Sequence, residues 1–143
     1  MMNGAMAQTI PPAHRMGIKV VEADRGHAVA TVPFEGNGNH FGVVYAGVQF
    51  TVAEILGGVI ALATFDPAEY YPLVKNIDIS FTGMARSDLR AEASLSEDEI
   101  TRIEAEAVEN GKADFTLDAE VKDEAGQTVS VTHGLYQLRA HGR

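Results

Sequence analysis

The sequence predicts an α+β domain in which an antiparallel sheet packs against one long buried helix. Residues 46–65 carry a single charged side chain, that of Glu54, and are apolar enough for a core helix. Residues 113–122 and 128–138 indicate two long strands, joined by a loop in which Gly126 can adopt a positive φ. One apolar helix combined with antiparallel strands is typical of the α+β class, and 143 residues suit one core.

Two faces of the predicted helix differ in the size of their side chains. One face is apolar at helical spacing and consists of Val48, Val52, Ile55, Val59 and Leu62. The other face is small apart from one carboxylate and consists of Gly47, Thr51, Glu54, Gly58 and Ala61. The pattern predicts a helix buried on nearly all sides, with one side open to close approach. A lone carboxylate there costs free energy unless it is paired or has a function.

Alternation and turn residues predict the remaining strands. Residues 18–23 and 27–34 indicate two strands, and a Gly/Asn-rich loop over residues 35–42 leads into the helix. Residues 73–82 indicate a strand with Leu73, Lys75, Ile77, Ile79 and Phe81 on one side and Val74, Asn76, Asp78 and Ser80 on the other. Residues 89–95 indicate a strand with Leu89, Ala91, Ala93 and Leu95 facing inward.

A short acidic helix is predicted over residues 97–109. Ser96 and Glu99 form a capping box at its start, and Asn110-Gly111 is a C-terminal stop. Its charges are interpreted as a solvated face.

The first residues are predicted to lie outside the domain. Residues 1–13 indicate a loose arm or a short helix, with Pro11 and Pro12 stopping any regular structure. We therefore expect an N-terminal arm over residues 1–17 and a single domain over residues 18–143. The first residues lack a basic segment followed by an apolar run, so no signal peptide is expected.

The composition argues against several classes of function. A net charge of −9 argues against nucleic-acid binding, which needs a basic surface. The chain has no cysteine, which removes disulfides and thiolate chemistry and fits a reducing cytoplasm. The five histidines show no metal-ligand spacing, so no metal is expected.

Residues 46–65 are also long enough for a transmembrane helix. A mid-span Glu54 would cost roughly 2.5–3.5 kcal/mol on insertion. No cluster of Lys or Arg flanks the segment, and the rest of the chain indicates strands. We therefore expect a core helix and no membrane partner.

The start of the long helix carries the most suggestive chemistry. Amides near Tyr45, Ala46 and Gly47 are unpaired at a helix N-terminus, and the helix dipole favours a carbonyl oxygen that becomes negative. Glu54, about two turns further on the small face, could activate a water or attack directly. The Asn39 amide could orient the carboxylate, the water or the substrate. The sequence lacks G-x-S-x-G, H-E-x-x-H and P-loop motifs.

The run of Asn39, five residues, Tyr45-Ala46-Gly47, six residues and Glu54 resembles the signature of hotdog-fold acyl-CoA thioesterases of the PaaI-like type. That signature has Asn, then His-Gly-Gly, then Asp or Glu on the central helix. The stretch FTVAE is similar to the family's motif there, and KADFTLDAEVKDEAG through GLYQLR resembles a related branch grouped as a domain of unknown function. The resemblance covers roughly residues 18–139.

The resemblance implies a curved antiparallel sheet of five or six strands wrapped around the helix. It also implies a homodimer or dimer of dimers with active sites at the subunit interface, thioester hydrolysis, and no cofactor except coenzyme A within the substrate. By position, Asn39 would be the polar orienting group. The amides of Ala46 and Gly47 would donate to the oxyanion, and Glu54 would be the base or nucleophile.

Two departures from the signature leave an alternative open. Tyr45 stands where the family usually has His, and Ala46 stands where it usually has Gly. Ala46 keeps its amide, whereas the phenol of Tyr45 can donate a hydrogen bond but does not replace histidine as a base. The alternative is a non-catalytic hotdog protein that binds an acyl or CoA-like ligand.

Substrate-binding candidates lie on the helix and among the cations. Thr51 and Gly58 share the small face with Glu54. Lys75, Arg86 and Arg90 are candidates for the nucleotide end of coenzyme A, or else are solubility charges.

Overall fold

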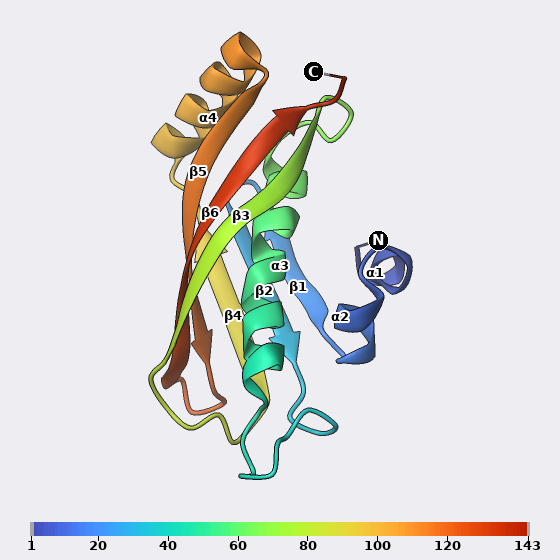
Figure 1. The fold of residues 1–143 in the computed structure, drawn as a ribbon, viewed down its shortest axis with the longest axis vertical. Coiled ribbons are helices and arrows are strands. Elements are labelled where there is room, and N and C mark those ends of the chain that lie inside the picture. Colours follow the sequence, from blue (N-terminus) through green and yellow to red (C-terminus); the bar gives the residue numbers. More distant parts are fainter. Residues whose placement is uncertain (1, 143) are drawn as a thin grey trace.

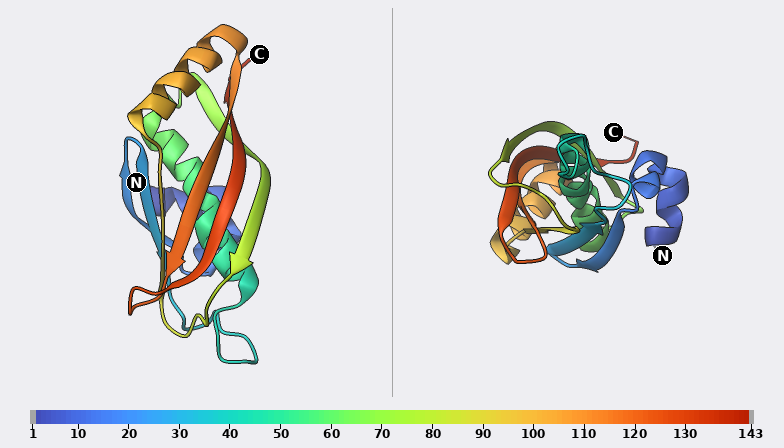
Figure 2. Two further views of the ribbon diagram at one scale, coloured as in Figure 1. Left: turned by 90° about the vertical axis from the view of Figure 1, so that its left-hand side faces the viewer. Right: turned by 90° about the horizontal axis from the view of Figure 1, so that it is seen from below.

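The computed structural model describes residues 2–142, and the side chains from residue 4 onward. The elements are α1 (Met2–Thr9), α2 (Pro11–Arg15), β1 (Lys19–Asp24), β2 (His27–Val32), α3 (Ala46–Thr64), β3 (Tyr70–Phe81), β4 (Leu89–Ser94), α4 (Glu97–Asn110), β5 (Lys112–Lys122) and β6 (Thr128–Ala140). Six antiparallel strands form one sheet in the order β1-β2-β4-β5-β6-β3. The sheet curves around α3 (Figures 1 and 2), which confirms the predicted fold class.

Helix α3 forms the centre of the core. Val48, Val52, Ile55 and Val59 are buried, as the apolar face predicts. The prediction that Leu62 belongs to this buried face is wrong. Leu62 is 46% exposed, on the side of α3 that the sheet does not cover. Ala61, expected on the small face, is instead buried in the core cluster.

Among the described residues, α3 is long and apolar enough to cross a membrane by length and composition. The core helix of a sheet-covered domain has the same composition, and α3 packs against all six strands and contributes most of one side to the core.

Of the loose arm or short helix expected at the N-terminus, the structure has the helix, but the two prolines act differently from the prediction. The segment forms two short helices, and Pro11 and Pro12 begin α2 instead of preventing regular structure. Proline fits the first turn of a helix because the amide that it lacks has no acceptor there. Met6 and Ala13 are buried in the core cluster, so the segment packs onto the domain beside β1 (Figure 1).

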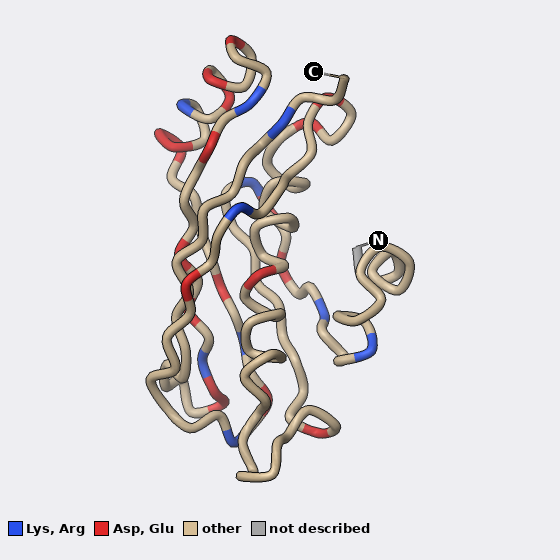
Figure 3. Tube along the Cα trace, viewed as in Figure 1, with Lys and Arg blue, Asp and Glu red and all other residues tan. Residues whose placement is uncertain are grey.

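Helix α4 is confirmed with its Ser96 N-cap and its Gly111 stop, but the Glu99 carboxylate pairs with Arg102 and does not complete the predicted capping box. The Ser96 hydroxyl oxygen accepts from the Glu99 amide at 3.1 Å, and Gly111 closes the helix with a φ of +78°. Several of the acidic residues of the molecule lie along this helix (Figure 3). Its apolar side chains enter the core, namely Ile100, Ile103 and Ala107.

Strand β3 starts earlier than predicted and carries a bulge. The register shifts between Val74 and Asn76, so alternation is interrupted at this point. Val74 pairs with the inward-facing Tyr136, and Leu73 pairs with the outward-facing Gln137. The predicted faces are therefore correct beyond the bulge and reversed before it, because one extra residue inverts every side chain that precedes it.

Candidate active site

Glu54 is half-buried on the middle turns of α3. Its carboxylate makes no hydrogen bond or ion pair with any residue in the described range 2–142. Burial raises the pKa of the Glu54 carboxyl above its ordinary value, since removal from water disfavours the charged form. A half-buried, unpaired carboxylate with a raised pKa is suited to accept a proton from a bound water.

The start of α3 presents two unpaired amides. Tyr45 is the N-cap, and its carbonyl oxygen accepts from the amides of Val48 at 3.0 Å and Gln49 at 3.2 Å. The amides of Ala46 and Gly47 have no acceptor within the described chain. They lie at the positive end of the helix dipole, where a developing oxyanion is stabilised.

The side chain of Tyr45 packs beside these amides without capping the helix. Its ring lies against Gly47, where a Cβ atom would come within 2.7 Å of Tyr45 Cε2. More than half of Tyr45 is exposed, and no hydrogen bond of its hydroxyl is present among the described residues. The hydroxyl is therefore free to contact a substrate at the helix N-terminus.

The loop before α3 uses its two asparagines differently. The Asn39 side-chain oxygen accepts from the amides of Phe41 at 2.9 Å and Val43 at 3.3 Å, so it stabilises its own loop and does not contact Glu54. Asn37, which the sequence reasoning missed, is buried and donates to the carbonyls of Met16 and Pro33. Its own carbonyl oxygen accepts from the Tyr45 amide at 2.8 Å, which holds the N-cap in place.

Thr51 and Gly58 lie on the same side of α3 as Glu54, as predicted. The Thr51 hydroxyl donates to the Gly47 carbonyl at 2.7 Å, so it is already satisfied within the helix. Gly58 faces open space, since a Cβ atom added there would have no neighbour within 4 Å. This side of α3 is therefore a helix face of small residues that also carries Glu54.

Tyr136 on β6 is a further residue at the site that the sequence reasoning missed. Its hydroxyl donates to the main-chain carbonyl oxygen of Glu54 at 3.2 Å. The residue is buried and its ring stacks on Phe115, with centroids 5.6 Å apart. Two glycines that flank the ring, Gly57 and Gly134, were the available signal in the sequence.

The three candidate cations are not equivalent. Lys75 pairs with Asp114 at 2.9 Å, and Arg90 pairs with Glu92 at 3.5 Å, both on the outer face of the sheet, away from α3. Arg86 is exposed in the β3–β4 loop, next to Ala85, whose carbonyl accepts from the Val44 amide at 2.7 Å. Of the three, Arg86 is therefore closest along the chain to a residue that contacts the start of α3.

The outer face of the sheet also holds an open hollow of about 680 Å³. Carboxylates and a histidine line much of it, including Asp78, Glu92, Asp118, Glu120 and His133. An acidic lining disfavours the phosphates of coenzyme A, and Glu54 is not part of it.

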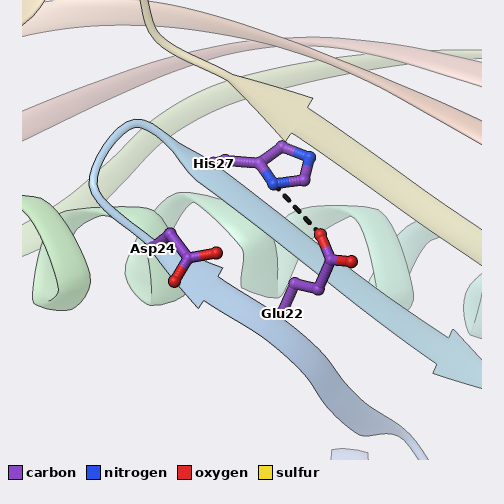
Figure 4. A group of neighbouring side chains, drawn as sticks. All are labelled: Glu22, Asp24 and His27. Atoms are coloured by element: carbon purple, nitrogen blue, oxygen red, sulfur yellow. Dashed lines mark ion pairs between the residues drawn. The ribbon is translucent and has the colours of Figure 1, made fainter.

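A second group of titratable side chains lies at the β1–β2 hairpin. Glu22, Asp24 and His27 place one ligand atom each within 4.8 Å of one another (Figure 4). Both ring nitrogens of His27 already contact carboxylates, those of Glu22 at 3.1 Å and Glu92 on β4. Cross-strand ion pairing accounts for this arrangement, and we assign no metal to it.

The raised pKa of Glu54 predicts a pH-dependent penalty on folding. A carboxyl whose pKa is higher in the folded state stabilises the fold when protonated, and that contribution is lost as pH rises through the folded pKa. Glu54→Gln stays neutral, so its stability relative to wild type should increase from acidic to neutral pH. Urea unfolding of both proteins across this range measures the difference, with the exposed Glu109→Gln as control. A difference that does not vary with pH would contradict the prediction.

Solved structures place this fold among the hotdog proteins, next to chains that are named as thioesterases. A Pseudomonas aeruginosa protein described as a probable thioesterase is 38% identical, covering 97% of this chain and 93% of its own, with a TM-score of 0.91. A Haemophilus influenzae thioesterase is 15% identical, covering 99% of this chain and 92% of its own, with a TM-score of 0.78. A thioesterase variant from Staphylococcus aureus, 15% identical, covers 90% of this chain and 98% of its own, with a TM-score of 0.75.

Sequence comparison gives the family. Residues 1–136 match the model described as "Domain of unknown function (DUF4442)", and the chain belongs to that family. A Deinococcus radiodurans protein provisionally named as an esterase is 30% identical over an alignment of 135 residues, which covers 91% of this chain and 76% of that protein.

Proposed function

We propose that the protein hydrolyses acyl-CoA thioesters, with Glu54 as base or nucleophile and the amides of Ala46 and Gly47 as oxyanion donors. The single observation that carries this proposal is the half-buried, unpaired Glu54 carboxylate on the open side of the central helix. The names of the thioesterases with the same fold support it. A reducing cytoplasm fits a chain without cysteine, and we assign the reaction to that compartment.

The geometry of α3 favours a site shared by two copies. The N-terminal amides point along the helix axis and away from Glu54, which lies about 10 Å further along the same helix. One thioester carbonyl therefore does not fit between both groups of a single chain. A second copy beside the first would bring the N-terminus of one α3 to the Glu54 of the other.

The exposed edge of the sheet supplies a surface for this pairing. Strand β3 is an edge strand of 12 residues, and Leu73, Val74 and Phe81 on it are 42–50% exposed. A long apolar edge of this kind invites strand pairing. We propose a homodimer, or a dimer of such dimers, joined along β3.

Sedimentation at micromolar concentration is expected to show a dimer. Val74→Lys should shift the protein toward monomer, because a charged side chain on an edge blocks pairing. Val21→Lys on β1, at the opposite edge and similarly exposed, is the matched control and should leave the assembly intact. A wild-type monomer would contradict both the assembly and the shared site.

Substitutions at Tyr45 test its hydroxyl as a substrate contact. Tyr45→Phe should lower kcat/KM by up to about tenfold, the value of one hydrogen bond. Tyr45→His should be tolerated, since the family signature has His there. Hydrolysis rates of the two variants decide this, and an unchanged rate for Tyr45→Phe would remove the hydroxyl from the reaction.

A screen of acyl-CoA thioesters tests the function. The substrates should vary in chain length and include aromatic acyl groups, with release of the free thiol as readout. A chain without cysteine adds no thiol background to this assay. We expect turnover on at least one class of acyl group. Binding of acyl-CoA without release of thiol would favour the alternative, a non-catalytic binding protein.

A further inference from the structure

Tyr136 connects the last strand of the sheet to the turn of α3 that carries Glu54. The two residues are 82 positions apart in the chain, and the Tyr136 hydroxyl donates to the Glu54 main-chain oxygen at 3.2 Å. That oxygen belongs to the helix backbone, so the hydrogen bond acts on the turn as a whole and not on the Glu54 side chain.

The space for the Tyr136 ring is shaped on two sides by glycines. A Cβ atom at Gly57 would lie 2.0 Å from Tyr136 Cε2, and one at Gly134 would lie 2.6 Å from Tyr136 Cε1. Phe115 stacks on the ring with an interplanar angle of 17°. The ring is therefore held between helix and sheet in one place, and its hydroxyl is fixed with it.

The surroundings of Tyr136 keep its phenol protonated, which is the form that donates a hydrogen bond. Burial, and after it the negative charge of the nearby Glu54, raise the pKa of Tyr136 well above its ordinary range. The hydroxyl therefore stays protonated at any pH at which the protein works.

We propose that Tyr136 is a positioning residue, which fixes the height and rotation of the Glu54 turn of α3 against β6 through its hydrogen bond to the Glu54 carbonyl. The direction of a helical side chain follows from the rotation of its turn. A catalytic group has to be held within about 0.5 Å of its productive position, and a displacement of 1 Å costs about a hundredfold in rate. This inference rests on the proposed thioesterase function for its catalytic consequence.

Tyr136→Phe isolates the hydroxyl. The variant keeps the ring, its stack on Phe115 and its fit against both glycines, and loses only the hydrogen bond. We expect kcat on the best thioester to fall about tenfold while KM changes less than about twofold, as for a small displacement of a catalytic group. Tyr71→Phe is the matched control, because no hydrogen bond of the Tyr71 hydroxyl is present among residues 2–142. Wild-type kcat in Tyr136→Phe would overturn the inference.

A second readout does not depend on turnover. The Glu54 carboxyl is titrated by carbon NMR in wild type, Tyr136→Phe and Tyr71→Phe, and exchange of the Gly58 amide is measured in the same samples. We expect Tyr136→Phe alone to move the Glu54 pKa toward its ordinary value and to speed exchange, because the released turn admits water. Identical titration and exchange in all three proteins would overturn the inference.

The two readouts separate this inference from the proposed function. If wild type hydrolyses no thioester, the proposed function fails, and the titration still decides the role of Tyr136. If wild type is active, Glu54→Gln is inactive and Tyr136→Phe matches wild type in rate and titration, the positioning inference alone fails.

Discussion

Glu54→Gln is expected to lower kcat by at least about a hundredfold while acyl-CoA binding is largely kept. The substitution preserves the shape of the side chain and removes the group that accepts a proton or attacks the carbonyl. A loss of this size is typical of a positioned general base. Burial raises the pKa of Glu54. The wild-type rate should therefore fall on acidification at a pH above the pKa range of ordinary carboxyl groups.

Glu109→Gln on α4 is the control for this measurement, since it removes an exposed carboxylate far from α3. Stopped-flow or steady-state rates give kcat, and equilibrium binding of acyl-CoA to both variants gives affinity. A Glu54→Gln protein with wild-type kcat would exclude Glu54 from the reaction.

Gly57→Ala is expected to destabilise the fold, although alanine is the better helix former. The propensity of alanine would add about 1 kcal/mol. The new Cβ atom would instead lie 2.0 Å from the Tyr136 ring, which cannot move away because Gly134 and Phe115 hold its other sides. Overpacking of this kind costs about 1–3 kcal/mol, and we expect a net loss in the free energy of unfolding.

Gly58→Ala is the matched control for Gly57→Ala. It lies one residue further along α3 but faces open space, so alanine there should gain up to about 1 kcal/mol of stability. Urea unfolding of the two variants should therefore show shifts of opposite sign. Equal shifts would contradict the close fit of Tyr136 against Gly57.

Local patterns predicted most of the fold. The apolar run of α3, the alternation of β4 and the caps of α4 each involve residues close in sequence, whose periodicity reports the buried face directly. The bulge in β3 lay beyond this reasoning, because a single extra residue leaves no trace in composition and reverses the faces before it. The prolines of α2 had the opposite effect to the one expected, since their role depends on position within a helix.

The candidate site was predictable only in part. Glu54 and the amides of α3 follow from the helix pattern, and the resemblance pointed to Asn39. The contact of Tyr136 with the Glu54 turn joins elements 82 residues apart, and no local pattern encodes such a pairing. The pairing of Lys75 and Arg90 with outer-face carboxylates likewise depends on strand register, which periodicity alone does not supply.

The central claim, thioester hydrolysis that depends on Glu54, is tested most directly by following thiol release from a panel of acyl-CoA substrates with wild type and Glu54→Gln side by side. The predicted result is turnover by wild type on at least one acyl class and a loss of at least about a hundredfold in the variant, with binding retained in both. Equal rates in the two proteins, or bound acyl-CoA that wild type never hydrolyses, would contradict it.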